Sequence, residues 1–338
     1  MFQCTAAFRG EVSRLDGKWQ AVMIPSTLTE DEAIDLALFT LAEALRQRRQ
    51  ISPTVSKTHL MKTVFRIAED TRLPITRCWF KFGQFVPNER VSPEHFAEVR
   101  DRGIGSLSGK VSSNLMGVLR TNAGSYVFFF SQPLDDYLPD YYRLQAPDKY
   151  RDIYTSNFGL VSFCKHLTEA PDHRGIRTHY ADGVVSLVTK FHRAVAPFIV
   201  DSEARSLVVE FTTFLEELVI RFDALNVSQS FNVREWADFF SRAFKHYVEK
   251  IWTLPAAQIG AETMVGPREG EERGKMLHTV SLGERHRKET FEPLRNEAEE
   301  KGYLPTEADL DGLVSVARQR TSRADAIEEL LYLTRKGE

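Results

Sequence analysis

Cysteine is scarce in this sequence, and its distribution excludes two classes of small stabilised domain. The 338 residues contain three cysteines, Cys4, Cys78 and Cys164, which are odd in number and far apart. A disulfide framework needs paired cysteines, and a thiolate zinc site needs closely spaced ones. The sequence therefore predicts a protein of a reducing compartment that depends on a hydrophobic core.

Long apolar runs are also absent. The longest one, Tyr126 to Phe130, is far shorter than the roughly 20 residues that a membrane-spanning helix needs. The first residues show no basic stretch followed by an apolar one, which a secretory signal peptide would need. We therefore expect a cytoplasmic protein with no membrane partner.

An excess of positive charge is missing as well. The 44 Lys and Arg residues are outnumbered by 47 Asp and Glu residues, and the formal net charge is -3. A protein that coats nucleic acid along its surface is normally clearly basic, so any nucleic-acid contact must lie on a local patch. The sequence also has no Gly-x-Ser-x-Gly nucleophile elbow. It favours a protein that is not an enzyme and that holds no metal and no cofactor.

Helical periodicity dominates what is present. Thr29 and Glu32 form a capping box in front of apolar residues at helical spacing, and Ser56 and Ser92 stand where two further helices would begin. Alternating residues around Asp16 predict a short hairpin at 8–24, and the apolar run at 126–130 predicts one strand. The sequence predicts a mainly α protein with a small β component, whose bundle core is formed by helices at 184–195, 203–225 and 234–252.

The periodic segments divide the chain into four parts. We expect an N-terminal α+β domain with a winged-helix-like segment at 1–130 and a helical bundle domain at 131–254. Glycines, a proline and charges without periodicity predict a linker at 255–283. A helix-turn-helix-like module is expected at 284–338.

The C-terminal module carries two short capped helices. Capping boxes at 306–309 and 322–325 frame residues 319–321 and give the proportions of a helix-turn-helix. With Leu330-Leu331 and the final Arg-Lys-Gly-Glu at 335–338, the tract resembles the C-terminal winged-helix domain of archaeal replicative helicases. This resemblance implies DNA contact through Arg318, Arg320, Arg323, Arg335 and Lys336.

A protein-docking role of the same module is the alternative. Glu328 and Glu329 lie where the second helix would face a DNA groove, and their charge would repel phosphate. In this interpretation residues 284–338 bind a protein partner.

A second segment, at 56–100, also points to nucleic acid. Lys57, Lys62 and the Phe82-Gly83 pair resemble the winged-helix-like segment of the Panacea family of antitoxin and phage-defence proteins, although Gln84 stands where that family has proline. Basic and aromatic residues interleave from Arg66 to Lys81, which would suit a nucleic-acid strand. Its aromatic residues are explained more simply as the core of a strand packed on the preceding helix. The candidate nucleic-acid contacts are Arg66, Arg77 and Lys81.

Five metal-capable side chains lie close together in the sequence. Such a cluster could hold a divalent metal that activates water, as in a metal-dependent hydrolase or nuclease. It contains no histidine pair at the i, i+4 spacing of a helical zinc site, and its composition is that of a solvated loop. The candidate catalytic residues are His166, Asp172, His173, His179 and Asp182.

Two further patterns are weaker. The glycine-rich stretch at 103–112 lacks the spacing of a P-loop and has Val111 where a hydroxyl is needed, so we expect a connector or a loose anion site. The acidic and aromatic stretch at 135–152 could chelate a hard cation, but an irregular surface loop accounts for it more simply.

These observations leave three hypotheses. The first is a non-enzymatic DNA-associated or regulatory binding protein, of antitoxin or phage-defence type, whose partner is DNA or a DNA-associated protein complex. The second is a structural subunit that docks through its C-terminal helices. The third is the metal-dependent hydrolase.

Overall fold

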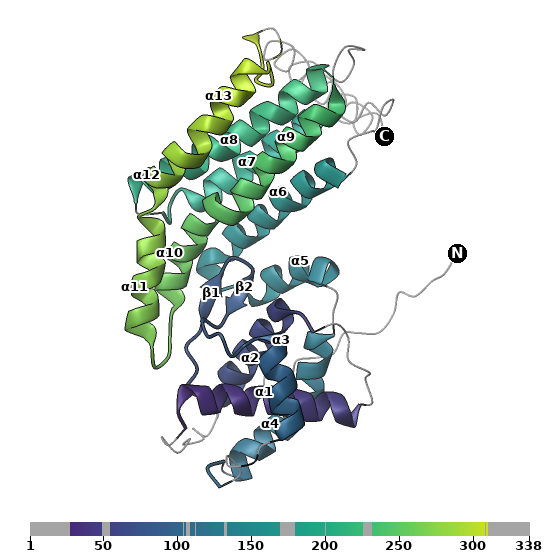
Figure 1. Ribbon diagram of the computed structural model, residues 1–338, viewed down its shortest axis with the longest axis vertical. Coiled ribbons are helices and arrows are strands. Elements are labelled where there is room, and N and C mark those ends of the chain that lie inside the picture. The colour runs from purple at the N-terminus through teal and green to yellow at the C-terminus, as the bar shows by residue number, and fades with distance from the viewer. Residues whose placement is uncertain are drawn as a thin grey trace, which may run out of the picture. The chain divides into compact units, whose positions relative to one another are not determined.

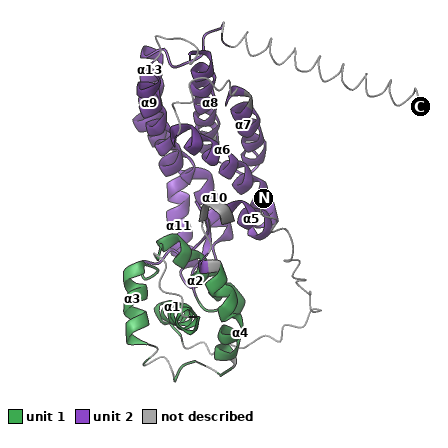
Figure 2. Ribbon diagram, turned by 90° about the vertical axis from the view of Figure 1, so that its right-hand side faces the viewer, with its two compact units in different colours: residues 1–74, 90–129 green, residues 75–89, 130–338 purple. Residues whose placement is uncertain are grey.

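The chain forms two compact units. The computed structural model describes residues 28–48, 55–103, 105, 109–111, 113–131, 134–169, 180–199, 201–225, 232–307 and 309 (Figure 1). Residues 1–74 and 90–129 form unit 1, and residues 75–89 and 130–338 form unit 2 (Figure 2). The mainly helical fold with a small β component is confirmed. The hairpin expected at 8–24 lies outside the described residues.

Unit 1 is built around one nearly buried helix. Its elements are α1 (Glu30–Gln47), α2 (Lys57–Thr71), α3 (Pro93–Arg102) and α4 (Ser113–Phe130), whose last residue falls in unit 2. The α1 side chains are buried on most sides because α2 and α3 both pack on it. The predicted caps are confirmed: Thr29 and Glu32 form a reciprocal capping box, and Ser56 and Ser92 accept backbone N–H groups of α2 and α3.

A buried carboxylate joins α1 to α3. Asp35 receives Arg90 at 3.2 Å, the His95 ring at 2.7 Å and Arg102 at 2.8 Å. A carboxylate buried on a helix is tolerated only when several donors satisfy its oxygens. This cluster therefore fixes how α3 lies against α1 within the unit.

The prediction of a strand at 126–130 is wrong, because these residues form the end of helix α4. A short apolar run cannot be assigned from its hydrophobicity alone. Here Leu115, Leu119, Tyr126 and Val127 are buried at helical spacing.

Unit 2 combines one small hairpin with a helical bundle. The hairpin strands β1 (Cys78–Phe80) and β2 (Gly83–Phe85) pair antiparallel, with Trp79 opposite Gln84. The other elements are α5 (Leu134–Gln145), η2 (Asp148–Tyr150), α6 (Arg151–Glu169), α7 (Tyr180–Val195), α8 (Ser202–Leu225), α9 (Val233–His246), η3 (Tyr247–Ile251), α10 (Thr253–Thr263), α11 (Glu269–Val280), α12 (Gly283–His286), η4 (Arg287–Phe291) and α13 (Glu292–Glu300).

Aromatic rings form much of the bundle core. Phe222 stacks on Trp236 with ring centroids 4.2 Å apart, and Trp236 stacks on Phe240 at 4.9 Å. Phe211 and Phe214 of α8 pack against Phe291. The three helices predicted at 184–195, 203–225 and 234–252 are confirmed, and the apolar face predicted for the second is fully buried.

The linker expected at 255–283 is wrong. Residues 253–263 form α10 and residues 269–280 form α11, and these two helices pack tightly on each other. Gly260 lies at the close approach, where a Cβ would meet the Met276 sulfur at 3.2 Å and the Trp79 carbonyl at 3.4 Å. Gly260, which looks like linker punctuation in the sequence, therefore serves helix packing.

The tract at 284–301 is helical as predicted, but it packs on the bundle. α12, η4 and α13 run along α8 and α9 (Figure 1), where Arg287 pairs with Glu210 at 2.5 Å and Arg242 with Glu297 at 2.6 Å. The capping box at Thr306 and Asp309 is confirmed, and Asp309 also pairs with Arg221 of α8 at 2.6 Å. Residues 310–338 lie outside the described residues.

Among the residues that the structure describes, no helix combines the length and the apolar character needed to cross a bilayer. Cys78 and Cys164 are buried free thiols, as expected for a chain without a disulfide framework. Burial raises the pKa of the Cys78 thiol to about 12, with the nearby Glu272 carboxylate adding to the effect. A thiol held protonated in this way is a poor nucleophile.

Lys62 of α2 provides a test of the unit 1 core. The side chain is fully buried, and this burial lowers its pKa from 10.5 to about 7. Between these two values the unfolded chain binds a proton that the folded chain does not, so stability rises with pH. Below pH 7 both states are protonated, and the folded state carries the whole cost of the buried charge.

We predict that Lys62→Met raises the free energy of unfolding at pH 6.5 by about 1–4 kcal/mol, as for other buried charges replaced by apolar groups. The variant should also lose much of the rise in stability between pH 7 and 10. Urea denaturation across this pH range measures both effects. Lys57→Met, at an exposed position of the same helix, is the matched control and should change stability by less than about 0.5 kcal/mol. A variant less stable than the wild type at every pH would contradict the prediction.

Candidate functional site

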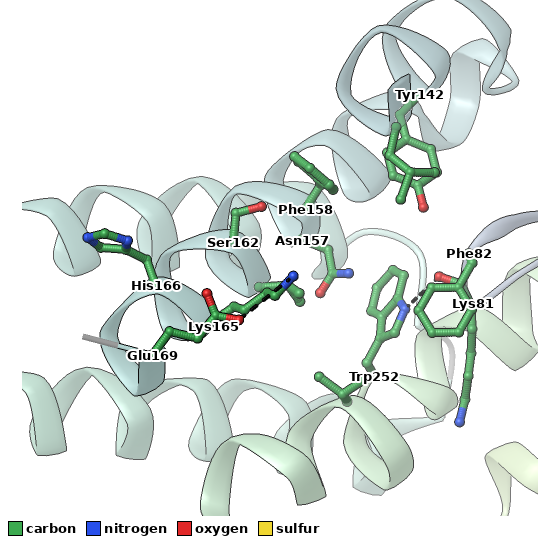
Figure 3. A pocket seen from close by; sticks show the side chains of 13 residues that line it. Lys81, Phe82, Tyr142, Asn157, Phe158, Ser162, Lys165, His166, Glu169 and Trp252 are labelled. Atoms are coloured by element: carbon green, nitrogen blue, oxygen red, sulfur yellow. Dashed lines mark hydrogen bonds and ion pairs between the residues drawn. The ribbon is translucent and has the colours of Figure 1, made fainter. Parts of the chain in front are cut away.

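A pocket in unit 2 lies where the hairpin turn meets three helices. Its volume is 310 Å³, and Figure 3 shows side chains from α5, α6, the end of η3 and the β1–β2 turn around it. Its lining is mainly apolar and aromatic, with polar groups along α6. The lining residues are Lys81, Phe82, Leu138, Tyr142, Asn157, Phe158, Val161, Ser162, Lys165, His166, Glu169, Val248 and Trp252.

One face of α6 supplies more than half of these residues. The positions from Asn157 to Glu169 recur every three or four residues, which is the spacing of one helical face. The opposite face of α6 carries Ile153, Leu160 and Leu167 into the core. The sequence of α6 therefore builds a packed side and a pocket side.

The hairpin turn is held in place by two aromatic donors. The Trp252 indole N–H donates to the Lys81 carbonyl at 2.9 Å, and the Tyr154 hydroxyl donates to the Phe80 carbonyl at 2.8 Å. Trp79 also stacks on Tyr141, with ring centroids 5.6 Å apart. These contacts fix Phe82 at the edge of the pocket.

A buried hydrogen bond orients the amide inside the pocket. The Tyr247 hydroxyl donates to Asn157 Oδ1 at 2.6 Å. This bond occupies the amide oxygen, so Asn157 can offer its N–H groups to the pocket. Burial raises the pKa of Tyr247 well above its ordinary value, so this phenol stays a donor.

Tyr247 begins a π-helical turn, η3. The backbone N–H of Trp252 bonds to the Tyr247 carbonyl five residues earlier, at 2.8 Å. Such turns are rare, and they are frequent at functional sites. η3 brings Val248 and Trp252 to the pocket while Tyr247 and Ile251 stay buried.

Charged groups line the far end of the pocket along α6. Lys165 and Glu169 lie 4.0 Å apart, and His166 is exposed beside them. In Figure 3 His166 and Glu169 lie away from Tyr142 and Trp252, and the Lys165 side chain extends toward Asn157. The pocket thus has an aromatic end and a charged end.

A second group of charges lies beyond the hairpin turn. The Lys81 ammonium points away from the pocket and donates to the Glu249 carbonyl at 2.8 Å, and Lys250 donates to the Thr290 hydroxyl at 2.9 Å. The pKa of His286 is lowered, first by burial and then by the nearby charges of Lys250, Arg285 and Lys81, while Glu289 opposes the shift.

His246 shows the same effect on α9. Its pKa is lowered by burial and by Lys250, Lys245 and Arg242, against the influence of Glu249. We call Lys81, Lys245, His246, Lys250, Arg285 and His286 the basic patch.

The structure brings together two residues that the sequence assigned to different roles. Lys81, a candidate nucleic-acid contact, and His166, a candidate metal ligand, both line the pocket. Arg77 lies in the same unit, where its guanidinium donates to the Ile75 carbonyl at 3.2 Å, while Arg66 lies on α2 of unit 1 beside Asp70 at 3.4 Å. The stretch read as one interleaved tract is therefore divided between the units.

The other candidate residues fall largely outside the described part of the chain. Asp182 belongs to α7, and nothing is described for Asp172, His173, His179 or the five C-terminal basic residues Arg318, Arg320, Arg323, Arg335 and Lys336. Within the described residues, no group of three or more His, Cys, Asp or Glu side chains could hold a metal ion. Metal chemistry and the C-terminal module stay predictions.

The two weaker patterns are resolved in part. Lys110 of the glycine-rich stretch pairs with Glu32 at 2.5 Å, and this contact lowers the pKa of Glu32. The surface loop expected at 135–152 is wrong, because α5, η2 and the start of α6 occupy it. Pro139 lies inside α5, and Tyr141 and Tyr142 are buried at the end of this helix. The proline residues in this stretch therefore do not mark a loop.

Comparison with known families places the pocket in a shared domain. Residues 125–316, more than half of the chain, match the family described as a domain of unknown function, DUF8098. The chain belongs to this family. The DUF8098 match includes the pocket walls from α5, α6 and η3, whereas Lys81 and Phe82 precede it. No curated protein and no solved structure matches the chain significantly.

The hydrogen bond between Tyr247 and Asn157 can be tested by one deletion. Tyr247→Phe removes the donor and leaves a buried amide oxygen unpaired, which should lower the free energy of unfolding by about 1–3 kcal/mol. Urea denaturation measures this loss. The matched control is Tyr303→Phe, since the buried Tyr303 ring packs on Phe239 at 5.4 Å and no hydroxyl bond is shown for it among the described residues. Equal effects of both substitutions would contradict the role of this bond.

Proposed function

We propose that this protein is a non-enzymatic DNA-associated binding protein that contacts single-stranded DNA through the basic patch. The observation that carries the proposal is the grouping around His286 of three cations, Lys81, Lys250 and Arg285, with one carboxylate, Glu289. A chain with a net charge of -3 needs such a local concentration of positive charge to bind a polyanion.

The hydrogen bonds of the two central lysines favour this role. Lys81 and Lys250 donate to a carbonyl and to a hydroxyl, neither of which carries charge. An ammonium group has three donors, so each lysine can also bind a phosphate oxygen. Arg285 differs, because Glu289 accepts its guanidinium at 2.9 Å and would compete with phosphate.

The lowered pKa values of two histidines support the binding of an anionic ligand at the basic patch. His246 and His286 are kept neutral by burial and by neighbouring cations. A phosphate group placed among these side chains would relieve the repulsion between the cations. The antitoxin or phage-defence role implied by the Panacea resemblance would be a regulatory use of this binding.

Binding should depend on salt and on the lysines of the patch. We expect a fluorescent single-stranded oligonucleotide to bind the wild-type protein at 50 mM salt and to dissociate as salt rises, as fluorescence anisotropy would show. Lys250→Gln removes one phosphate contact. The variant should bind roughly fivefold more weakly at 0.1 M salt and show a smaller salt slope.

Lys275→Gln is the matched control. This exposed lysine of α11 is paired with Glu271 at 2.7 Å and with Glu272 at 2.8 Å, so its loss should leave DNA binding unchanged. Circular dichroism confirms that each variant is folded. No binding of any single strand or duplex at 50 mM salt would overturn the proposed function.

A further inference from the structure

The hairpin turn places two consecutive residues on two different surfaces. The Lys81 ammonium reaches the basic patch, whereas the Phe82 ring lies at the aromatic end of the pocket and is 50% exposed (Figure 3). The pocket and the patch therefore meet at this turn. A ligand that crosses the turn would touch both.

The aromatic end of the pocket suits a flat ring. Phe82, Tyr142, Phe158 and Trp252 supply four ring systems to one cavity. The volume of 310 Å³ lies at the lower end of the roughly 300–1,000 Å³ of small-molecule sites. The pocket is therefore sized for one small group. Aromatic side chains hold nucleic-acid bases by stacking, and they do so with little dependence on which base is present.

Asn157 adds hydrogen-bond donors to this aromatic pocket. Because its oxygen accepts the Tyr247 hydroxyl, it presents N–H donors to the pocket. Nucleobases carry ring nitrogen and carbonyl oxygen acceptors on their edges. The amide can therefore bond to the edge of a stacked base.

Lysine side chains lie at both ends of this path. Lys165 lines the far end of the pocket beside Glu169, and Lys81 and Lys250 lie beyond the hairpin turn. A nucleotide chain carries a phosphate on either side of each base. The distribution of charge matches a strand that passes over the turn with one base turned into the pocket.

We infer that the pocket binds one unstacked nucleobase of a single-stranded segment whose phosphates lie on the basic patch. This inference rests on the proposed function and names the part of the ligand that the pocket takes. A free nucleotide offers the same base and phosphate, so the experiment includes it as a separate ligand.

The test compares two single-stranded oligonucleotides of equal length and charge, one of thymidines and one with abasic sites throughout. The wild-type protein should bind the thymidine strand about tenfold more tightly, which is a typical effect of stacking one base. Phe82→Ala should remove this difference while it leaves binding of the abasic strand unchanged. Phe128→Ala, at a 64% exposed phenylalanine of unit 1, is the matched control and should keep the difference.

Asn157→Asp is a second variant, in which the carboxylate still accepts the Tyr247 hydroxyl but offers no N–H group. It should lose most of the preference for the thymidine strand. Because the new carboxylate is buried and lowers stability, circular dichroism must confirm that the variant is folded under the binding conditions. A wild-type protein that binds both strands equally overturns the base pocket and leaves the proposed function standing. A protein that binds thymidine monophosphate but neither strand overturns the proposed function and assigns the pocket to a free nucleotide. Binding of no ligand overturns both.

Discussion

The site depends on side-chain donors that hold a hairpin too short to be stable alone. β1 and β2 contribute three residues each, and an isolated two-stranded hairpin is at best marginally stable in water. The Trp252 indole and the Tyr154 hydroxyl satisfy the Lys81 and Phe80 carbonyls, and the Thr263 hydroxyl accepts the Trp79 N–H at 2.9 Å. Because Trp252 is also a pocket wall, the position of the turn and the shape of the pocket are set together.

Two π-helical turns in the described part of unit 2 also shape this region. η3 and η4 interrupt the helices α9–α10 and α12–α13, and Lys250 of η3 donates to Thr290 of η4 at 2.9 Å. A π-helical turn is less favourable than an α-helical one and persists where packing requires it. Here Tyr247 and Phe291 both pack on Phe211, so the core favours both irregular turns. The pocket and the basic patch lie at these turns.

Much of the helical fold could be predicted, because its signals are local. The caps at Thr29, Ser56 and Ser92 and the apolar face of α8 follow from residues within a few turns of each other. The failures share a physical cause. The run at 126–130, the proline inside α5 and Gly260 of α10 have ambiguous local preferences, and tertiary packing decides them. At Gly260 a side chain would meet Met276 and the Trp79 carbonyl, and neither contact can be read from the sequence.

Only two residues of the pocket could be predicted from the sequence. Lys81 and His166 were candidates because basic side chains and imidazoles are recognisable in a sequence. Their proximity in the pocket depends on how the hairpin packs against α6. Asn157, Tyr247 and Trp252 gave no signal, because an amide, a phenol and an indole at helical spacing are indistinguishable from core residues. Their role arises from one buried hydrogen bond and from a π-helical turn, neither of which has a sequence pattern. The polar and aromatic groups of this pocket are thus positioned by the packing of the bundle. The residues that define its binding properties match no sequence motif.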